Sequence, residues 1–330
     1  MNKNLPISTG SYFYPSAYLS LLVNRMVELC PNVSLTVLRL SAIIVFSAIG
    51  LTSTLTGCSG VGQKVSAVQN EGQSEDPALS ALDNYIHNDD KSFRWEMVSE
   101  STDGKGTGYV VKMTSQTWHD IVWQHSMYII EPAQLTNPES CTLYITGGAN
   151  GNGPRESDMQ SAQLIANLSG MYVAVLWQVP NQPLLGDFTE DGLITETFLK
   201  MLETGDESWP LLFPMAKSAV RAMDAVQELL KKQNNRDIKG FVVFGASKRG
   251  WTTWLTAATK DPRVIAIAPM VINVLNMQTQ ASYQMTNWGF YREQIADYYS
   301  RHLLADQIDP SAPAAERELH GRLWRMIDPY

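Results

Sequence analysis

The spacing of apolar residues predicts a short helix and then an antiparallel meander in the first part of the folded chain. The helical pattern covers 79–87, and β-type segments follow at 92–101, 108–118 and 125–132. Asp103-Gly104, between the first two segments, is typical of a hairpin turn. We therefore expect strands that pair with their neighbours in sequence.

Further along, strand-like and helical patterns alternate. Strands are predicted at 141–148, 171–180, 241–245 and 264–272, and helices at 157–170, from Pro214 onwards, and at 248–259. Strand, helix, strand units of this kind build parallel sheets. The pattern predicts an α/β fold with a doubly wound, mostly parallel sheet that is preceded by antiparallel N-terminal strands.

The N-terminus has the layout of a secretory signal. Residues 40–55 are uncharged and mostly apolar, Arg25 and Arg39 precede them, and the stretch is shorter than the ~20 residues of a spanning helix. The segment ending at Cys58 resembles a bacterial lipobox, which predicts diacylation of Cys58 and anchoring by two acyl chains. An uncleaved anchor or a chance cysteine is the alternative.

This interpretation divides the chain into a signal peptide (1–57), a flexible tether (58–78) and a folded domain (79–330). Translation starts at Met1 or Met26. Ser59 is not the aspartate that commonly retains lipoproteins in the inner membrane, so we expect a location on the outer membrane, facing the periplasm or the surface.

Composition and charge exclude several classes of protein. The chain has 330 residues, 44% of them apolar and 18% charged, as in ordinary globular proteins. The formal net charge of −8 and the lack of a basic cluster argue against nucleic-acid binding. Three scattered cysteines provide neither a disulfide framework nor a zinc site, and we expect no cofactor or metal.

The run FGASKRG (244–250) places Ser247 between a predicted buried strand and a predicted helix. A nucleophile elbow has this context, although its usual pattern is G-x-S-x-G and here the second glycine is displaced to Gly250. Ser247 is therefore a candidate nucleophile. An N-capping serine at the start of the helix is the alternative.

A glycine-rich run, ITGGANG (145–151), follows a predicted strand upstream of Ser247. In an α/β-hydrolase the loop in this position donates a backbone N–H to the oxyanion. We expect the N–H groups of Gly148, Ala149 and Lys248 to form the oxyanion hole. A plain loop or a phosphate-binding turn is the alternative, but the spacing matches no dinucleotide or P-loop motif.

Several segments resemble one protein family. SQTWHDIVWQH (115–125), VPNQP (179–183), residues 205–226 and residues 244–272 are similar to the PhoPQ-activated pathogenicity-related protein family. The resemblance implies an α/β-hydrolase fold, a secretion signal and Ser247 as the nucleophile. It supplies no substrate, so an ester, amide or peptide remains open.

The residues after the elbow raise a question about the rest of the site. In α/β-hydrolases an acid and then a histidine follow the serine along the chain. Residues 273–330 are similar to a helical lid, with an aromatic-rich helix expected at 288–304, and the ending RLWRMIDPY resembles the family segment that leads to the acid-bearing strand. We therefore expect the domain to be C-terminally truncated before its last two strands, without the acid and the histidine.

The five histidines do not readily replace the missing base. His87, His119 and His125 precede the elbow, and His302 and His320 lie in the lid-like region. The sequence thus predicts a virulence-associated envelope lipoprotein with a serine-hydrolase-like domain, which transfers acyl groups if it is active. A non-catalytic binding protein on the same fold and a truncated inactive relative are the alternatives.

Overall fold

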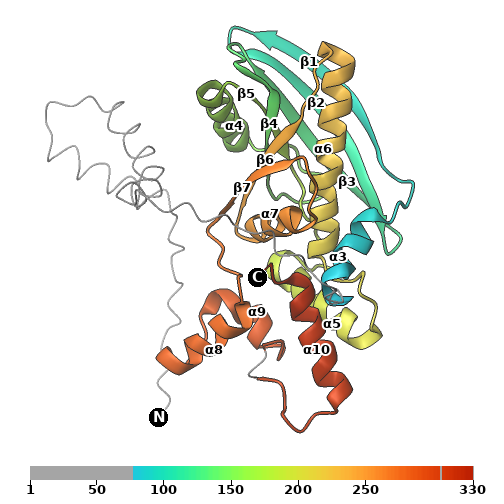
Figure 1. The fold of residues 1–330 in the computed structure, drawn as a ribbon, viewed down its shortest axis with the longest axis vertical. Helices are drawn as coiled ribbons and strands as arrows, with labels where there is room; N and C mark the ends of the chain where they lie inside the picture. The colour runs from blue at the N-terminus through green and yellow to red at the C-terminus, as the bar shows by residue number, and fades with distance from the viewer. Residues whose placement is uncertain (1–76, 305–306, 330) are drawn as a thin grey trace, which may run out of the picture. The chain divides into compact units, whose positions relative to one another are not determined.

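The computed structural model describes residues 77–304 and 307–329, in which one mixed sheet is flanked by helices (Figure 1). The sheet has seven strands in the order β1-β2-β3-β5-β4-β6-β7. The strands are β1 Arg94–Asp103, β2 Gly106–Trp118, β3 Ile121–Pro132, β4 Asn137–Ile145, β5 Met171–Leu176, β6 Gly240–Ala246 and β7 Val264–Met270.

Strand pairing changes once across the sheet, from antiparallel to parallel. The pairs β1-β2, β2-β3 and β3-β5 are antiparallel, whereas β5-β4, β4-β6 and β6-β7 are parallel. The antiparallel meander and the parallel sheet predicted from the sequence are thus confirmed. β4 and β6 are neighbours, and Ile145 pairs with Gly245. The glycine-rich loop and the turn with Ser247 therefore leave the same edge of the sheet next to each other.

Helices cover both faces of the sheet, unequally. They are α3 Pro77–His87, α4 Glu156–Ser169, α5 Glu190–Thr204, α6 Leu212–Asn234, α7 Lys248–Ala258, α8 Met277–Trp288, the 3₁₀ helix η1 Glu293–Ile295, α9 Ala296–Tyr299 and α10 Ala314–Ile327. Because strand side chains alternate, Val173 and Val175 of β5 pack with α4, while Tyr172 and Ala174 join the larger core that contains α6 and α7.

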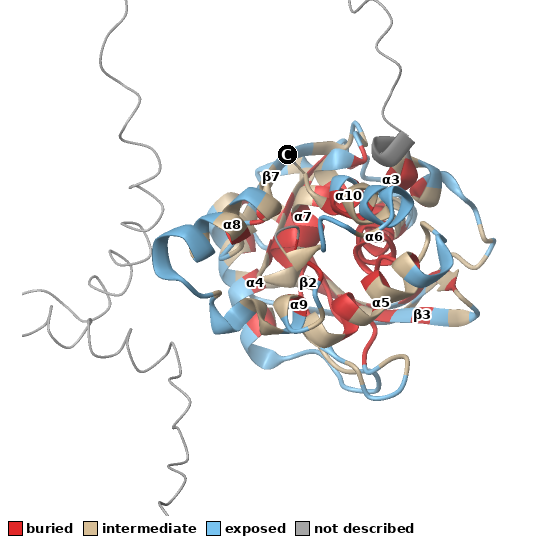
Figure 2. Ribbon diagram, turned by 90° about the horizontal axis from the view of Figure 1, so that it is seen from below, coloured by how far each residue is buried: buried red, intermediate tan, exposed pale blue. Residues whose placement is uncertain are grey.

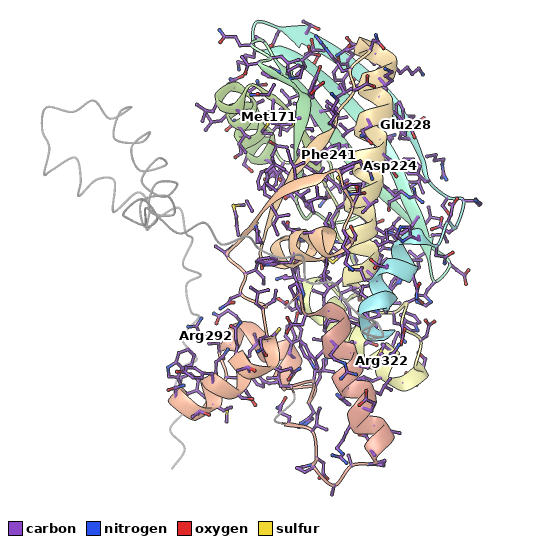
Figure 3. All side chains as sticks on the ribbon, viewed as in Figure 1. Met171, Asp224, Glu228, Phe241, Arg292 and Arg322 are labelled. Atoms are coloured by element: carbon purple, nitrogen blue, oxygen red, sulfur yellow. The ribbon has the colours of Figure 1, made fainter. Side chains whose placement is uncertain are left out.

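The longest described helix, α6, holds that larger core together. It begins at Leu212 rather than at the predicted Pro214, and a proline is tolerated in a first turn because its missing N–H would have no partner there. On its polar side, Asp224 forms an ion pair with Arg263 at 2.7 Å, and Glu228 accepts a hydrogen bond from the Trp95 indole at 2.6 Å (Figure 3).

The C-terminal helical segment (residues 271–304 and 307–329) differs from the prediction. The single helix expected at 288–304 is wrong, because α8 ends at Trp288 and Gly289 follows in the left-handed region at φ 74°. Asp328 links the ends of this segment, since its carboxylate accepts hydrogen bonds from the N–H groups of Asn276 and Met277. Buried residues concentrate in α6 and α7, whereas α8 is largely exposed (Figure 2).

Several sequence predictions fall where no structure is described. The signal peptide (1–57), Cys58 and most of the tether (58–78) lie outside the described residues, and α3 begins at Pro77, just inside the predicted tether. Within the described residues, none of the helices has the length and apolar character needed to cross a membrane.

Candidate active site

Ser247 lies in a strained turn between β6 and α7. Its backbone has φ 57° and ψ −126°, a conformation that costs free energy for a residue with a side chain. The turn is held from the neighbouring strand, because the Ser247 N–H donates to the carbonyl of Met270 at 3.0 Å. A sharp strand-to-helix turn with a serine at its tip is the geometry of a nucleophile elbow.

Two glycines explain the unusual motif spacing. A Cβ on Gly245 would lie 2.7 Å from the carbonyl oxygen of Arg249, and one on Gly250 would lie 2.9 Å from the carbonyl oxygen of Met270. Neither position has room for a side chain. The displaced Gly250 thus allows α7 to pack closely against the end of β7, and the position two after the serine is free to hold Arg249.

The hydroxyl of Ser247 does not cap α7. Ser247 occupies the N-cap position, but its side chain forms no capping hydrogen bond, and its backbone is far from the extended conformation of ordinary N-caps. The alternative of an N-capping serine is therefore wrong. The strain at Ser247 is not explained by helix capping.

The glycine-rich loop presents unused donors beside this turn. Gly148 has φ 140°, and within the described part of the chain the N–H groups of Gly148 and Ala149 donate no hydrogen bond. The loop is fixed from below, since the N–H of Asn150 donates to Gln182 at 2.7 Å and the Gln178 amide donates to the carbonyl of Asn152 at 2.7 Å. Free N–H groups on a fixed loop are suited to an anionic oxygen.

Arg249 joins the turn of Ser247 to the start of α5 through a partly buried ion pair. Its guanidinium donates to both oxygens of Glu190, at 2.6 and 2.7 Å, and to the carbonyl of Val179 at 2.6 Å. It also fills the space beside Gly147, where a Cβ would overlap the guanidinium. Burial alone would raise the pKa of Glu190, but its hydrogen bonds with Arg249 and the charges of Arg249 and Lys248 outweigh burial and lower the pKa to about 2.

Lys248 forms ion pairs with Glu190 and with Asp191. Its ammonium lies 2.8 Å from the Asp191 carboxylate and 3.2 Å from Glu190, and the Tyr298 hydroxyl donates to the other oxygen of Asp191 at 3.0 Å. Burial would lower the pKa of Lys248, but its partners Asp191 and Glu190 raise it above the usual value. A lysine held in its charged form cannot accept the proton of Ser247.

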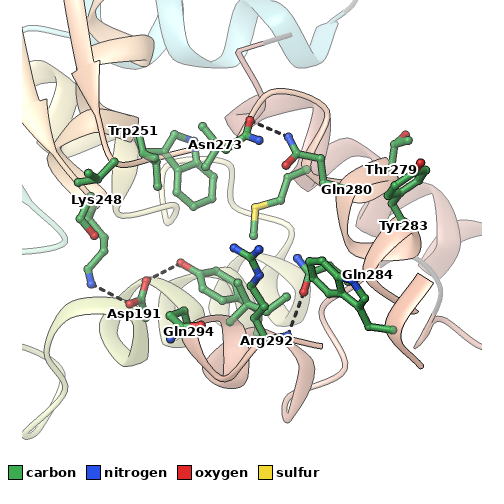
Figure 4. Close-up of a pocket in the computed structure, with 18 residues that line it drawn as sticks. Asp191, Lys248, Trp251, Asn273, Thr279, Gln280, Tyr283, Gln284, Arg292 and Gln294 are labelled. Carbon is green, nitrogen blue, oxygen red and sulfur yellow. Dashed lines mark hydrogen bonds and ion pairs between the residues drawn. The ribbon is translucent and has the colours of Figure 1, made fainter. Parts of the chain in front are cut away.

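Ser247 opens into a pocket of about 830 Å³ between the sheet edge and the C-terminal helical segment (Figure 4). Lys248, Asp191 and Tyr298 line it together with the serine. The remaining lining residues are Trp251, Val271, Ile272, Asn273, Val274, Met277, Thr279, Gln280, Tyr283, Gln284, Trp288, Arg292, Gln294 and Ile295. Gly148 and Ala149 adjoin the elbow but do not line this pocket.

The described histidines lie elsewhere. His125 is buried, with Nδ1 donating to the carbonyl of Trp177 at 3.0 Å and Nε2 accepting from Ser115 at 2.9 Å, and burial lowers its pKa to about 4. His119 stacks on Trp209 with ring centres 3.7 Å apart. His302 and His320 line a separate pocket beside α5, and no described histidine lines the pocket of Ser247.

The described side chains form no metal-binding cluster. The partners of His119 and His125 are protein groups, and the described residues contain no cluster of three or more His, Cys, Asp or Glu that could hold a metal ion. Cys141 is fully buried in β4, and burial raises the pKa of its thiol. It is a core residue.

The sequence from residue 82 to residue 330 matches the family model described as PhoPQ-activated pathogenicity-related protein. The chain belongs to this family. Its sheet order and serine turn are those of an α/β-hydrolase-like fold.

The chain is also similar to individual proteins. "Autocrine proliferation repressor protein A" of Dictyostelium discoideum is 35% identical over 229 residues, which cover 66% of this chain and 46% of the relative. The chain thus spans about half the length of this curated relative. Among solved structures, it is similar to acetyl xylan esterase 1 from Thermoanaerobacterium sp. (16% identity, 76% of this chain and 73% of that chain, TM-score 0.48). It is also similar to an acetyl xylan esterase from Paenibacillus sp. R4 (16% identity, 77% and 72%, TM-score 0.46).

Sequence reasoning missed the carboxylates of the site. Glu190 and Asp191 stand at the start of α5, almost sixty residues before the serine, and nothing in their local pattern marks them. The signal that could have indicated them is the pair Lys248-Arg249 directly after the serine. Two adjacent cations that follow a buried strand are expected to be partly buried, and buried charges need partners of opposite charge. The sequence does not show which carboxylates these partners are.

Proposed function

We propose that the folded domain transfers acyl groups from an ester or amide, with Ser247 as the nucleophile. The observation that carries this proposal is the strained turn of Ser247 at φ 57°. Ser247 lines the pocket, and its hydroxyl forms no capping hydrogen bond to α7. Strain of this kind persists where the surrounding structure enforces it and is frequent at functional sites. The Met270 carbonyl, Gly245 and Gly250 enforce it here.

In the proposed reaction the Ser247 oxygen attacks the carbonyl carbon, and the carbonyl oxygen becomes an oxyanion. The N–H of Lys248, at the start of α7, and those of Gly148 and Ala149 would hold this oxyanion, since none of the three is used within the described structure. Collapse of the intermediate expels the alcohol or amine and leaves an acyl-serine, which water then hydrolyses.

The proton of the hydroxyl needs an acceptor. A serine hydroxyl is a weak nucleophile at neutral pH without an adjacent base, and no described histidine lines the pocket. Loss of triad residues in serine proteases leaves ~10³ to 10⁴-fold acceleration over water. We therefore expect the 330-residue chain to acylate slowly and to release the acyl group slowly.

The test is p-nitrophenyl acetate with wild-type protein and Ser247→Ala, followed by mass spectrometry of the peptide that contains residue 247. A slow, stoichiometric release of nitrophenolate with acetyl on Ser247, absent from the variant, supports the proposal. Equal release by both proteins, with no acetyl on Ser247, contradicts it. Fast turnover that depends on Ser247 would show that a base is present within these residues, with His302 and His320 as the first candidates.

A second candidate function is binding without catalysis on the same fold. It is favoured by one observation, the lack of a histidine beside Ser247 among the described residues. The two functions separate in the same assay, because a binding protein retains its ligand affinity in Ser247→Ala and forms no acyl-serine.

We also propose that the protein is an envelope lipoprotein anchored through Cys58. The support is the lipobox-like segment of the sequence, which lies outside the described residues. Wild-type protein expressed in bacteria should carry acyl label and sediment with membranes, and Cys58→Ala should lose both properties. An unlabelled, freely soluble wild-type protein would contradict the anchor. A role in bacterial virulence rests on the family description and is measured by comparing a deletion strain with its complemented strain.

A further inference from the structure

The side chains that line the pocket of Ser247 include more positive than negative charges. Its lining contains one carboxylate, Asp191, and two cations, Lys248 and Arg292, although the whole chain has a formal net charge of −8. Asp191 is neutralised by Lys248 at 2.8 Å. The positive charge that remains belongs to Arg292.

Arg292 has no carboxylate partner within the described structure. Its backbone N–H donates to the side chain of Gln284 at 2.9 Å, and its guanidinium lies 4.9 Å from the ring centre of Trp288. These two contacts orient the residue without neutralising it. The guanidinium projects into the open space of the pocket, where its donors are available (Figure 4).

The surfaces near Arg292 are aromatic and apolar. Tyr283 and Trp288 of α8 are exposed, and both line the pocket together with Trp251 and Ile272. An unpaired guanidinium beside aromatic rings suits a ligand with a carboxylate on an apolar body, because the planar donors of arginine match a carboxylate and the rings bury the rest.

We infer that the pocket selects acyl substrates that carry a carboxylate, which Arg292 binds while Ser247 attacks the ester or amide carbonyl. The inference rests on the proposed function, because it names the substrate class of that site. Arg292 is a specificity-determining residue in this scheme. Lys248 has no part in binding the carboxylate, since Glu190 and Asp191 already occupy its ammonium.

Binding is measured first, without any turnover. Ser247→Ala protein is titrated with 3-phenylpropionate and with its neutral isostere 3-phenylpropanamide, and the intrinsic fluorescence of the pocket tryptophans reports binding. We expect the carboxylate to bind about tenfold more tightly than the amide. Adding Arg292→Gln should remove this preference, whereas Arg292→Lys should keep part of it. Arg317→Gln, on the exposed surface of α10, is the matched control and should change nothing.

Turnover is measured second. Wild-type protein is compared on p-nitrophenyl hemisuccinate and on neutral p-nitrophenyl butyrate, with the Arg292 variants beside it. A preference for the anionic ester that Arg292→Gln abolishes through KM supports the inference. If the Ser247→Ala protein prefers the carboxylate but no ester is cleaved, the proposed function fails and carboxylate recognition stands. Equal affinity for the two phenylpropanoids, or a preference unchanged in Arg292→Gln, overturns the inference while leaving acyl transfer intact.

Discussion

Two regions around the Ser247 pocket differ in how their charged side chains are paired. The starts of α5 and α7 carry a connected set of ion pairs in which every charge has a partner, namely Lys248, Arg249, Glu190 and Asp191. Lys248 and Asp191 of this set line the pocket. On the C-terminal helical segment, Arg292 has no ionic partner within the described structure, and Trp288 is 48% exposed. We interpret the first wall as a fixed frame for the nucleophile and the second as a surface that recognises a ligand.

In the proposed function, this one pocket both positions Ser247 for reaction and recognises a ligand. Chemistry at Ser247 needs groups held in place before the substrate arrives, which the paired charges provide. Recognition needs groups whose hydrogen-bonding capacity remains free, as at Arg292. Trp251 also lines the pocket, and its indole donates to the carbonyl of Ile327 at 2.7 Å, which ties α7 to the end of α10.

The largest expected difference between the two walls is in the free energy of unfolding when a tryptophan of each wall is replaced by alanine. Trp251 is 2% exposed, so Trp251→Ala should lower the free energy of unfolding by about 3–5 kcal/mol, as for other buried aromatic side chains. Trp288→Ala should change it by less than about 0.5 kcal/mol. Urea unfolding of both variants measures the difference, and similar losses would remove the distinction between the walls.

A side chain at Gly147 should damage the frame directly. A Cβ there would overlap the Arg249 guanidinium, so Gly147→Ala has to displace Arg249 from its partners. We expect a loss of about 1–3 kcal/mol in stability and about 100-fold in the rate of Ser247 acylation. Gly153→Ala, in the same loop with open space around it, is the control. Equal rates in the two variants would show that Arg249 does not position the site.

Glu190→Gln should leave Arg249 with an unpaired buried charge. Breaking such a pair costs about 3–5 kcal/mol when it is fully buried, and we expect about 2 kcal/mol because the Glu190 side chain is 37% exposed. Glu139→Gln, which breaks an exposed pair with Lys239, should have almost no effect.

The contribution of Glu190 to stability should also depend on pH. Because the folded-state pKa of Glu190 is lowered to about 2, this contribution is present above the ordinary pKa and is lost as the pH falls from about 4.5 towards 2. Thermal melts from pH 6 to pH 2.5 should show a shallower decline for Glu190→Gln than for wild type.

His125 should contribute a separate effect at higher pH. Burial lowers its folded-state pKa to about 4, so the unfolded chain takes up a proton at a higher pH than the folded one. Its contribution is therefore complete above about pH 6.5 and is lost as the pH falls to about 4. His125→Asn should flatten the stability profile between these values. An unchanged slope would mean that the pKa of His125 is the same in the folded and the unfolded protein.

The sequence was sufficient for most of the sheet and for the turn at Ser247, because these depend on local patterns. Runs of apolar residues marked the strands, and the small residues around Ser247 marked the elbow. The failure at 288–304 has a local cause, since Gly289 interrupts a pattern that otherwise reads as helical. The carboxylate partners could not be predicted, because Glu190 meets Arg249 only through the order of strands in the folded sheet.

Fluorophosphonate labelling mapped to individual residues tests most directly whether the ion pairs around Ser247 make this serine a nucleophile. Ser247 should be modified in preference to Ser311, an exposed serine of the C-terminal helical segment, and Ser247→Ala should remove this labelling. Because no described histidine lines the pocket, the rate should be slow at pH 7 and rise steadily towards pH 9. Labelling of Ser247 no faster than that of Ser311 at any pH would contradict the claim.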